Sequence, residues 1–327
     1  MLENWITRMK KVGAFLLLAA LASCSSSQEQ SSVLTIGILQ TASHPALDQA
    51  REGFMQELNA QLDGKVRFVV QNAEGSIAQA RSIAQRFHAD SHIDGIFAIA
   101  TPAAQAAASV ERQKPIFFAA VTDPEKAGLK QANHCGTSDM INVPNEIELL
   151  IDLVPQAKRV AILFNPSEIN SVTVKDKMKD ELEKRGMQVI LVGVSQESEM
   201  AMAATSAMQK SDAILTPIDN TVAMALPTLA KISRAHHRPL IVSDNLLVEK
   251  GALAARGVDY FQSGEKAAAL AVEVFVKGKK PGDLALAQSS SSLAVINQEV
   301  LKELGLSMPE KWIGEAIIVN QQAGKKP

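Results

Sequence analysis

Short polar turns after apolar strands hold most of the residues in this sequence that could bind or transform a small molecule. The turn QTASHP at residues 40–45 follows one apolar run, and the turns ATPAAQ, VTDP, NPSEINS, PIDNT and SDN follow others. Their hydroxyl, amide and carboxylate groups are typical of helix starts, as is proline in the first turn. In an open α/β sheet, ligands lie beyond the carboxyl ends of the strands. The turns therefore predict a shared binding cleft.

The chemistry of these turns suits a small zwitterion. Backbone N–H groups and the positive end of a helix dipole favour a carboxylate, and a carboxylate side chain favours an ammonium group through charge-assisted hydrogen bonds. Ser43 and His44 can edge such a cleft. Five aspartates fall in or near the turns: Asp123, Asp139, Asp219, Asp244 and Asp259. Each of them could instead simply cap a helix, and the sequence leaves that alternative open.

Signals for catalysis, metals and nucleic acids are absent from the sequence. It contains no G-x-G-x-x-G, G-x-x-x-x-G-K-[ST] or G-x-S-x-G pattern. His88 and His92 are spaced i, i+4, and His236 and His237 are adjacent, but neither pair has further ligands at metal-like spacing. The formal net charge of −2 gives no electrostatic footprint for nucleic acid. We therefore expect no enzyme activity, no metal or cofactor, and no nucleic-acid partner.

The N-terminus predicts export and lipid anchoring. Three basic residues precede the apolar run VGAFLLLAALAS, which is typical of a signal peptide over residues 1–23. LASC resembles a bacterial lipobox, so we expect lipidation at Cys24 and a flexible tether over residues 24–32. An ordinary signal peptide with an incidental cysteine is the alternative. Cleavage leaves 304 residues, enough for two domains, and Cys135 as the one other cysteine, which excludes an intramolecular disulfide.

The order of predicted elements occurs twice along the chain. Apolar, β-branched runs alternate with longer helical patterns, which is typical of parallel sheets with crossover helices. The eight predicted strands are 34–39, 66–71, 95–100, 115–121, 159–164, 188–194, 213–217 and 239–243. In each half a proline-containing turn follows the first strand, and a basic residue and a proline open the last one. We therefore predict an α/β fold of two similar Rossmann-like lobes.

The chain resembles the substrate-binding lipoproteins of bacterial ABC importers, in the subfamily whose members bind aromatic amino acids such as tryptophan. The stretches that carry the resemblance are GILQ…HPALDQAREGF, QNAEGS, AIATPAAQAAA, AVTDPEKAGL, GTSDM, NPSEINS, PIDNTVA and GALAARGVDYFQSG. The resemblance implies a type I periplasmic-binding fold, with parallel-sheet lobes joined by a multi-strand hinge and a ligand between them. Position by position it implies these binding residues: Thr101, Ala103, Thr122, Asp123, Ser138 and Asp139 from the first half, and Ser167, Asn170, Asp219 and Asn220 from the second.

The segment Ser243-Asp244-Asn245 departs from the family pattern, because relatives often have an acidic run there. We include Asp244 among the predicted ligand residues, as the carboxylate that this altered run retains. For Tyr260, the single tyrosine, core packing is the expected role.

The expected hinge divides the chain into discontinuous lobes. We predict lobe 1 over 33–139 and 257–282, lobe 2 over 140–256 and 283–320, and a tail over 321–327. The helix within residues 263–280 should pack on lobe 1. The implied function is capture of a small amino acid, of the aromatic class, by a monomer that faces the periplasm or cell exterior and delivers it to an ABC permease with its ATPase. The alternative is a ligand-binding sensor that docks on a periplasmic signalling receptor.

Overall fold

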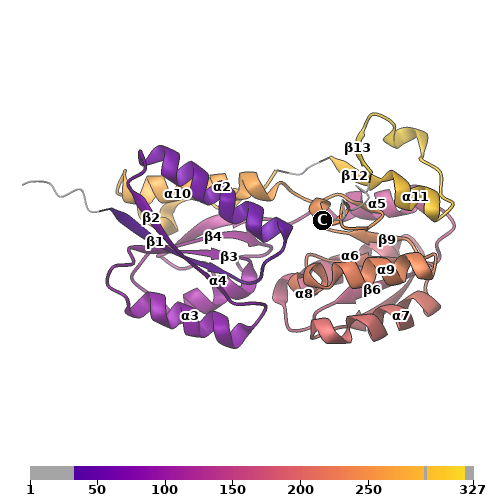
Figure 1. Ribbon diagram of the computed structural model, residues 1–327, viewed down its shortest axis with the longest axis horizontal. Helices are drawn as coiled ribbons and strands as arrows, with labels where there is room; N and C mark the ends of the chain where they lie inside the picture. Colours follow the sequence, from indigo (N-terminus) through magenta and orange to yellow (C-terminus); the bar gives the residue numbers. More distant parts are fainter. Residues whose placement is uncertain (1–32, 291–292, 321–327) are drawn as a thin grey trace, which may run out of the picture. The chain divides into compact units, whose positions relative to one another are not determined.

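A computed structural model describes residues 33–290 and 293–320, and the residues from Leu34 onward form one compact unit with two β-sheets (Figure 1). The predicted signal peptide, Cys24, the tether and the tail over 321–327 lie outside the described residues. Within the described part of the chain, no helix is both long and apolar enough to cross a bilayer.

The first sheet has six parallel strands in the order β11-β5-β4-β3-β1-β2. Its strands are β1 (Leu34–Gln40), β2 (Val66–Asn72), β3 (Gly95–Ile99), β4 (Ile116–Val121), β5 (His134–Ser138) and β11 (Ala287–Gln288). Its helices are α2 (Pro45–Gln61), α3 (Ile77–Ala89), α4 (Thr101–Val110) and α10 (Tyr260–Phe275). β3 and β4 are buried along their whole length, which accounts for their continuous apolar sequences.

The second sheet has seven strands in the order β13-β12-β10-β9-β8-β6-β7, all parallel except for the β10–β12 pair. Its strands are β6 (Arg159–Phe164), β7 (Gln188–Gly193), β8 (Ala213–Thr216), β9 (Leu240–Val242), β10 (Ala254–Ala255), β12 (Ala294–Asn297) and β13 (Ala316–Val319). Its helices are α5 (Val143–Leu153), α6 (Ile169–Lys184), α7 (Met200–Lys210), α8 (Asn220–Met224), α9 (Leu226–Ala235) and α11 (Gln298–Glu303).

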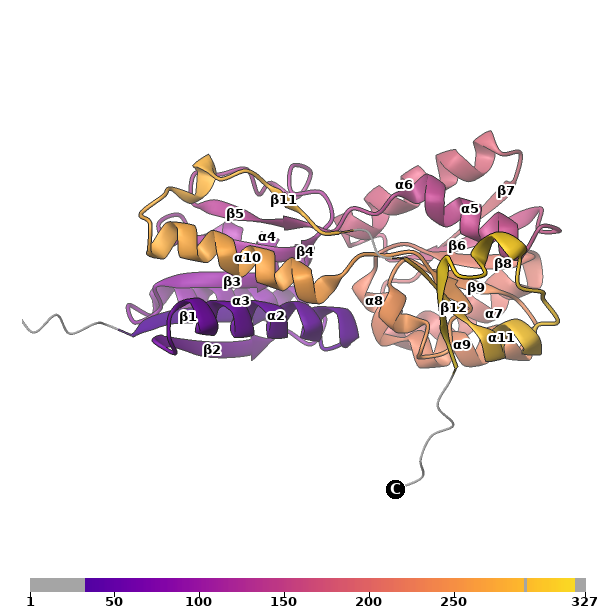
Figure 2. The same cartoon turned by 90° about the horizontal axis from the view of Figure 1, so that it is seen from above.

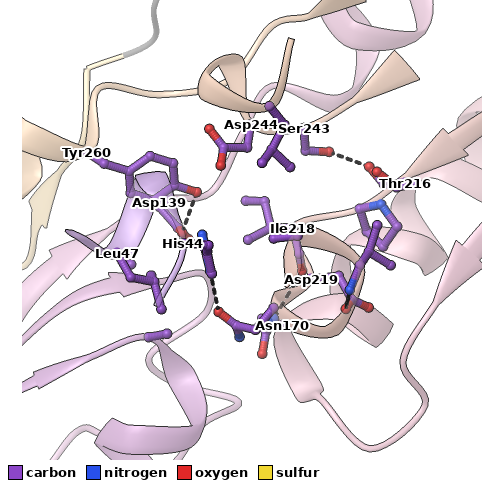
Figure 3. A pocket seen from close by; sticks show the side chains of 17 residues that line it. His44, Leu47, Asp139, Asn170, Thr216, Ile218, Asp219, Ser243, Asp244 and Tyr260 are labelled. Atoms are coloured by element: carbon purple, nitrogen blue, oxygen red, sulfur yellow. Dashed lines mark hydrogen bonds between the residues drawn. The ribbon is translucent and has the colours of Figure 1, made fainter. Parts of the chain in front are cut away.

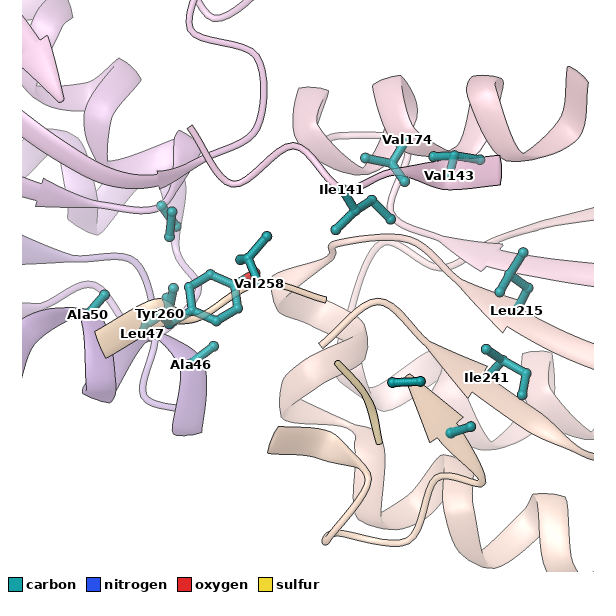
Figure 4. Close-up of a cluster of buried hydrophobic side chains, with 14 of the residues drawn as sticks. Ala46, Leu47, Ala50, Ile141, Val143, Val174, Leu215, Ile241, Val258 and Tyr260 are labelled. Carbon is teal, nitrogen blue, oxygen red and sulfur yellow. The ribbon is translucent and has the colours of Figure 1, made fainter. Parts of the chain in front are cut away.

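The internal repeat predicted from sequence is present in the strand order. The first five strands of the first sheet run β2-β1-β3-β4-β5, and those of the second sheet run β7-β6-β8-β9-β10. Both follow the 2-1-3-4-5 order of a doubly wound α/β fold. The chain passes between the sheets three times, after β5, after β10 and after β11 (Figure 2). Ile141 and Val258 lie on the first two passages and belong to one buried apolar cluster with side chains from both sheets (Figure 4).

Helix α10 returns to the first sheet and packs against α2, β4 and β5, as the sequence predicts (Figure 2). Glycines make the close approach of α10 to α2 possible. A Cβ atom on Gly264 would lie 2.1 Å from the main-chain oxygen of Ala50, and one on Gly53 would lie 2.1 Å from that of Phe261. The two helices therefore meet backbone to backbone, which fixes Tyr260 at the start of α10.

Two sequence predictions about element boundaries are wrong. Residues 283–320 were expected to belong wholly to lobe 2, but β11 pairs with β5, with Ala287 opposite Thr137 and Gln288 opposite Ser138. The return to the second sheet therefore comes after Gln288. The strand predicted over 95–100 ends one residue earlier, at Ile99, because Ala100 adopts φ 75° and ψ 160° and leaves the extended conformation, although its N–H still donates to the Ala119 carbonyl at 3.0 Å.

Candidate functional site

A pocket lies at the carboxyl ends of strands from both sheets (Figure 3). Its empty volume is about 420 Å³, part of which is open solvent. The lining residues are His44, Leu47, Ala100, Ala120, Asp139, Asn170, Thr216, Pro217, Ile218, Asp219, Asn220, Val222, Ala223, Ser243, Asp244, Leu247 and Tyr260. There is no lysine or arginine among them.

The strand order explains why the pocket forms at this place. In a 2-1-3-4-5 sheet, the connections after strands 1 and 3 leave on opposite sides and open a crevice at that switch point. In the first sheet β1 leads to His44 and β3 leads to Ala100. In the second sheet β6 leads toward Asn170 and β8 leads toward Asp219. All four of these residues line the pocket, so the two switch points contribute to one site.

One group of polar residues lies next to the passages between the sheets. The Tyr260 hydroxyl donates to Asp139 Oδ2 at 3.2 Å, and both side chains are buried. Burial raises the pKa of Asp139 to about 6, although the hydrogen bond from Tyr260 opposes that rise. Burial also raises the pKa of Asp244 to about 7, and the charge of Asp139 adds to this rise. Asp244 Oδ1 accepts from the Leu246 N–H at 2.9 Å, whereas Oδ2 is buried and has no partner among the described residues.

A second group joins the first sheet to the second. His44 Nε2 lies 3.2 Å from Asn220 Oδ1. The Asn220 amide is oriented by its Nδ2, which donates to Glu168 Oε2 at 2.6 Å, so Asn220 Oδ1 must accept and His44 Nε2 must carry the proton. Burial lowers the pKa of His44, which keeps the ring neutral. His44 Nδ1 is therefore an acceptor, and no donor in the described part of the chain reaches it.

Asn170 is held in a similar way. Its Nδ2 donates to Glu168 Oε2 at 3.1 Å and to the Ile218 carbonyl at 3.0 Å. These two bonds fix the orientation of the amide and leave Oδ1 as a buried acceptor that no described residue satisfies. Two residues that line the pocket, one from each sheet, thus each hold a buried acceptor that no described residue satisfies.

Asp219 has a structural role in the same region. Its Oδ1 accepts from the Val222 N–H at 2.9 Å, and its Oδ2 accepts from the Asn165 N–H at 2.5 Å and the Ser171 hydroxyl at 2.6 Å. Burial and the charge of the neighbouring Glu168 raise the pKa of Asp219. Although Asp219 lines the pocket, both of its oxygens are already used to cap α8 and to hold the turn after β6.

The backbone is strained at two positions of the pocket wall. Ala100 has φ 75° and ψ 160°, a region that is otherwise almost restricted to glycine, and Ala120 has φ 56°. Ala120 lies at the irregularity where the register between β4 and β5 shifts. Such strain costs about 1–3 kcal/mol per residue and concentrates at functional sites.

The structure brings together six of the thirteen ligand residues expected from the sequence. His44, Asp139, Asn170, Asp219, Asn220 and Asp244 line the pocket. The other seven do not line it. Ser43 is exposed and donates to Asp48 at 3.1 Å. Asp123 accepts from the Lys126 N–H at 3.0 Å, as a cap. Ser167 is exposed and lies in a separate groove beside Pro102.

The remaining four are buried behind the pocket wall. Ala103 donates its N–H to Thr41 Oγ1 at 3.1 Å, and the Ser138 hydroxyl donates to the Thr122 carbonyl at 2.9 Å. The Thr122 hydroxyl is buried and has no partner among the described residues. Thr101 is 1% exposed, and its hydroxyl has no partner within residues 33–290 and 293–320.

Sequence reasoning missed the apolar part of the wall and misjudged Tyr260. Leu47, Ile218, Val222 and Leu247 line the pocket but look like ordinary core residues in the sequence. Tyr260 is buried, as expected, but it also contacts the pocket and Asp139. One feature of the sequence could have indicated a place in the pocket: Tyr260 is the first residue of a helix that follows a passage between the sheets.

The candidate metal residues have other partners. His88 Nδ1 lies 2.9 Å from Glu111 Oε2, and His92 Nδ1 lies 3.0 Å from Asp90 Oδ1. Over the described ranges, no group of three or more histidine, cysteine, aspartate or glutamate side chains is arranged to hold a metal ion. Burial raises the pKa of the Cys135 thiol to about 12, so this cysteine is not a nucleophile at neutral pH.

Two doubly wound lobes with a buried, acidic pocket between their switch points define a solute-binding protein of the type I periplasmic class. The leucine-binding protein LivK of Thermotoga maritima shares this fold, with a TM-score of 0.56 at 15% identity over 83% of this chain and 87% of that one. The family model for ABC transporter substrate binding proteins matches residues 35–319, and the chain belongs to that family.

Two relatives are considerably more similar in sequence. A tyrosine-binding protein of Clostridioides difficile (strain R20291) is 36% identical over 280 residues, which cover 83% of this chain and 81% of the relative. The crystal structure of an ABC domain from Streptococcus pneumonia in complex with L-Trp superimposes with a TM-score of 0.84. It is 34% identical, and the match covers 88% of this chain and all of that one.

Proposed function

We propose that this protein captures an aromatic amino acid outside the cytoplasm and delivers it to an ABC permease with its ATPase. The observation that carries the proposal is the buried pocket with Asp139 and Asp244 in its wall and no lysine or arginine beside them. Two carboxyl groups without a cationic partner favour a ligand that brings an ammonium group. The relatives that bind tyrosine and L-Trp support an aromatic side chain on that ligand.

The rest of the pocket suits the remaining parts of an aromatic amino acid. Leu47, Ile218 and Leu247 offer apolar contacts to a ring. Helix α4 starts at Thr101, directly after the lining residue Ala100, and a helix N-terminus favours a carboxylate.

A thermal-shift panel tests the ligand class. Binding of a ligand to the folded state raises its stability by RT ln(1 + [L]/Kd), about 4 kcal/mol at 1,000 Kd. We expect L-tryptophan or L-tyrosine to raise the melting temperature of the protein, and sugars to leave it unchanged. A shift produced only by a sugar or a nucleoside would overturn the ligand class.

Asp244→Asn tests the ammonium contact, with Asp123→Asn as a matched control. Asp244→Asn keeps the side-chain volume but removes the charge, and we expect at least about a tenfold loss of affinity by calorimetry. Asp123 also follows a strand, but it lies outside the pocket, so its variant should bind normally. Equal affinities for the two variants would contradict the assignment of Asp244.

Lipidation of Cys24 belongs to the same proposal. It rests on the sequence LASC after a basic and apolar leader. An anchored monomer that faces the periplasm or cell exterior would keep its pocket close to a permease. Cys24→Ser should release the protein from the membrane fraction and abolish incorporation of a labelled fatty acid. Retention of the label in this variant would refute lipidation at this residue.

A further inference from the structure

We propose that His44 and Asn170 select aromatic amino acids whose ring carries a hydrogen-bond donor, the phenol of tyrosine or the indole of tryptophan, and reject phenylalanine. This inference rests on the proposed function of the pocket and specifies its ligand. It is based on two unsatisfied atoms of these residues that can only accept a hydrogen bond. His44 Nδ1 and Asn170 Oδ1 are both fixed as acceptors by the hydrogen bonds at the other end of each side chain.

Neither acceptor can be satisfied by a simple flip of the side chain. Exchanging the oxygen and nitrogen of the Asn170 amide would place its oxygen against Glu168 Oε2 and the Ile218 carbonyl, which are both acceptors. Moving the His44 proton to Nδ1 would leave Nε2 facing Asn220 Oδ1, again two acceptors. The network through Glu168 therefore holds both atoms as acceptors, and the ligand has to bring the donor.

One of the two acceptors, on Asn170, lies across the pocket from Asp244 (Figure 3). Figure 3 shows Asp244 and Asn170 on opposite sides of the pocket, with Ile218 between them. An amino acid whose ammonium group meets the aspartates then extends its side chain along the apolar wall toward His44 and Asn170. A ring donor at the far end would satisfy one of the acceptors.

Phenylalanine would leave both acceptors buried and unpaired. His44 is 9% exposed and Asn170 is 3% exposed, so solvent cannot replace the missing donor once the ligand fills the pocket. A site built to hydrogen-bond a ligand group rejects the analogue that lacks it far more strongly than a purely apolar pocket does. We expect discrimination against phenylalanine of about 100-fold or more.

Calorimetry with L-tyrosine, L-tryptophan and L-phenylalanine tests this inference on three variants. His44→Phe keeps a ring but removes the acceptor, so tyrosine and tryptophan should bind at least about tenfold more weakly while phenylalanine does not lose affinity. His44→Asn keeps an acceptor at the position of Nδ1, although it loses the contact with Asn220, and should retain most of the preference. Ser43→Ala, one residue away and outside the pocket, should bind like the unaltered protein.

The outcomes separate this inference from the proposed function. Equal affinity of the unaltered protein for all three amino acids would overturn the inference and leave the proposed function standing. An equal loss for all three in His44→Phe would also overturn it, because His44 would then act only in the structure of the pocket. Binding of no aromatic amino acid would overturn both.

Discussion

Glu146 carries a buried carboxyl group directly behind the pocket wall. Its oxygens lie 3.0 and 3.1 Å from Ser243 Oγ, and Ser243 Oγ lies 2.9 Å from the Thr216 carbonyl oxygen. Ser243 has one proton, which cannot serve both partners. Every group is satisfied if Ser243 donates to the Thr216 carbonyl and a protonated Glu146 donates to Ser243 Oγ. This agrees with burial, which raises the pKa of Glu146 to about 8 from 4.5.

The raised pKa makes the stability of the protein depend on pH with a definite sign. Between about pH 4.5 and pH 8, folded Glu146 keeps its proton while unfolded Glu146 releases it. The free energy of unfolding therefore falls by about 1.36 kcal/mol per pH unit in this window. Glu146→Gln removes this dependence and keeps a donor for Ser243. Relative to the unaltered protein, the variant should gain about 2–3 kcal/mol between pH 5 and pH 7.

Urea unfolding at pH 5, 6 and 7 measures this gain. Any effect of the amide on packing is independent of pH and cancels when the same variant is compared across the series. Glu148→Gln on the same helix is the matched control, because Glu148 is only partly buried and its hydrogen bond with Lys311 lowers its pKa. Its effect on stability should be small and of opposite sign. A stability difference for Glu146→Gln that stays constant or shrinks as pH rises would refute the assignment of a neutral Glu146.

Four further perturbations test the site and its support. Acidification from pH 8 to pH 5 should weaken amino-acid binding about tenfold or more, because protonation of Asp139 and Asp244 removes the charges that hold an ammonium group; equal calorimetric affinities at the two pH values would contradict this. Asp219→Asn should lower the free energy of unfolding by about 1–3 kcal/mol in urea, since an amide cannot accept all three bonds; an unchanged midpoint would disprove its structural role. Ala100→Gly should raise stability by about 1 kcal/mol by relieving the positive φ, and a destabilised variant would show that the strain is absent. Gly264→Ala should lower the free energy of unfolding by about 3 kcal/mol, because the added Cβ would lie 2.1 Å from a main-chain oxygen of α2. An unaltered melting temperature would mean that α10 and α2 can move apart without loss of stability.

Long, continuously apolar strands were predictable because both faces of a parallel sheet are buried. The predicted strand over 159–164 matches β6, and the predicted strands over 34–39, 66–71 and 188–194 differ from β1, β2 and β7 by one residue at an end. Strands β5, β10, β11, β12 and β13 were not predicted. β5 reads HCGTS, β10 and β11 have two residues each, and β12 and β13 have four each, so they are too short or too irregular to carry a clear periodic signal. They form because neighbouring strands offer them hydrogen-bond partners, which a local pattern cannot reveal.

The sequence by itself determined the class of fold and the edge at which the site forms. Two copies of one strand–turn–helix pattern lead to two similar sheets, and polar turns after parallel strands must gather at their carboxyl ends. The tertiary structure alone decided which polar groups face the pocket. Asp219 and Asp244 both follow a strand as the cap of a short helix, yet Asp219 is saturated by the turn after β6, whereas Asp244 keeps one oxygen unpartnered among the described residues. That difference depends on residues far apart in the sequence. Asn165 and Ser171 lie about 50 positions before Asp219, and only the folded chain brings them to its carboxylate.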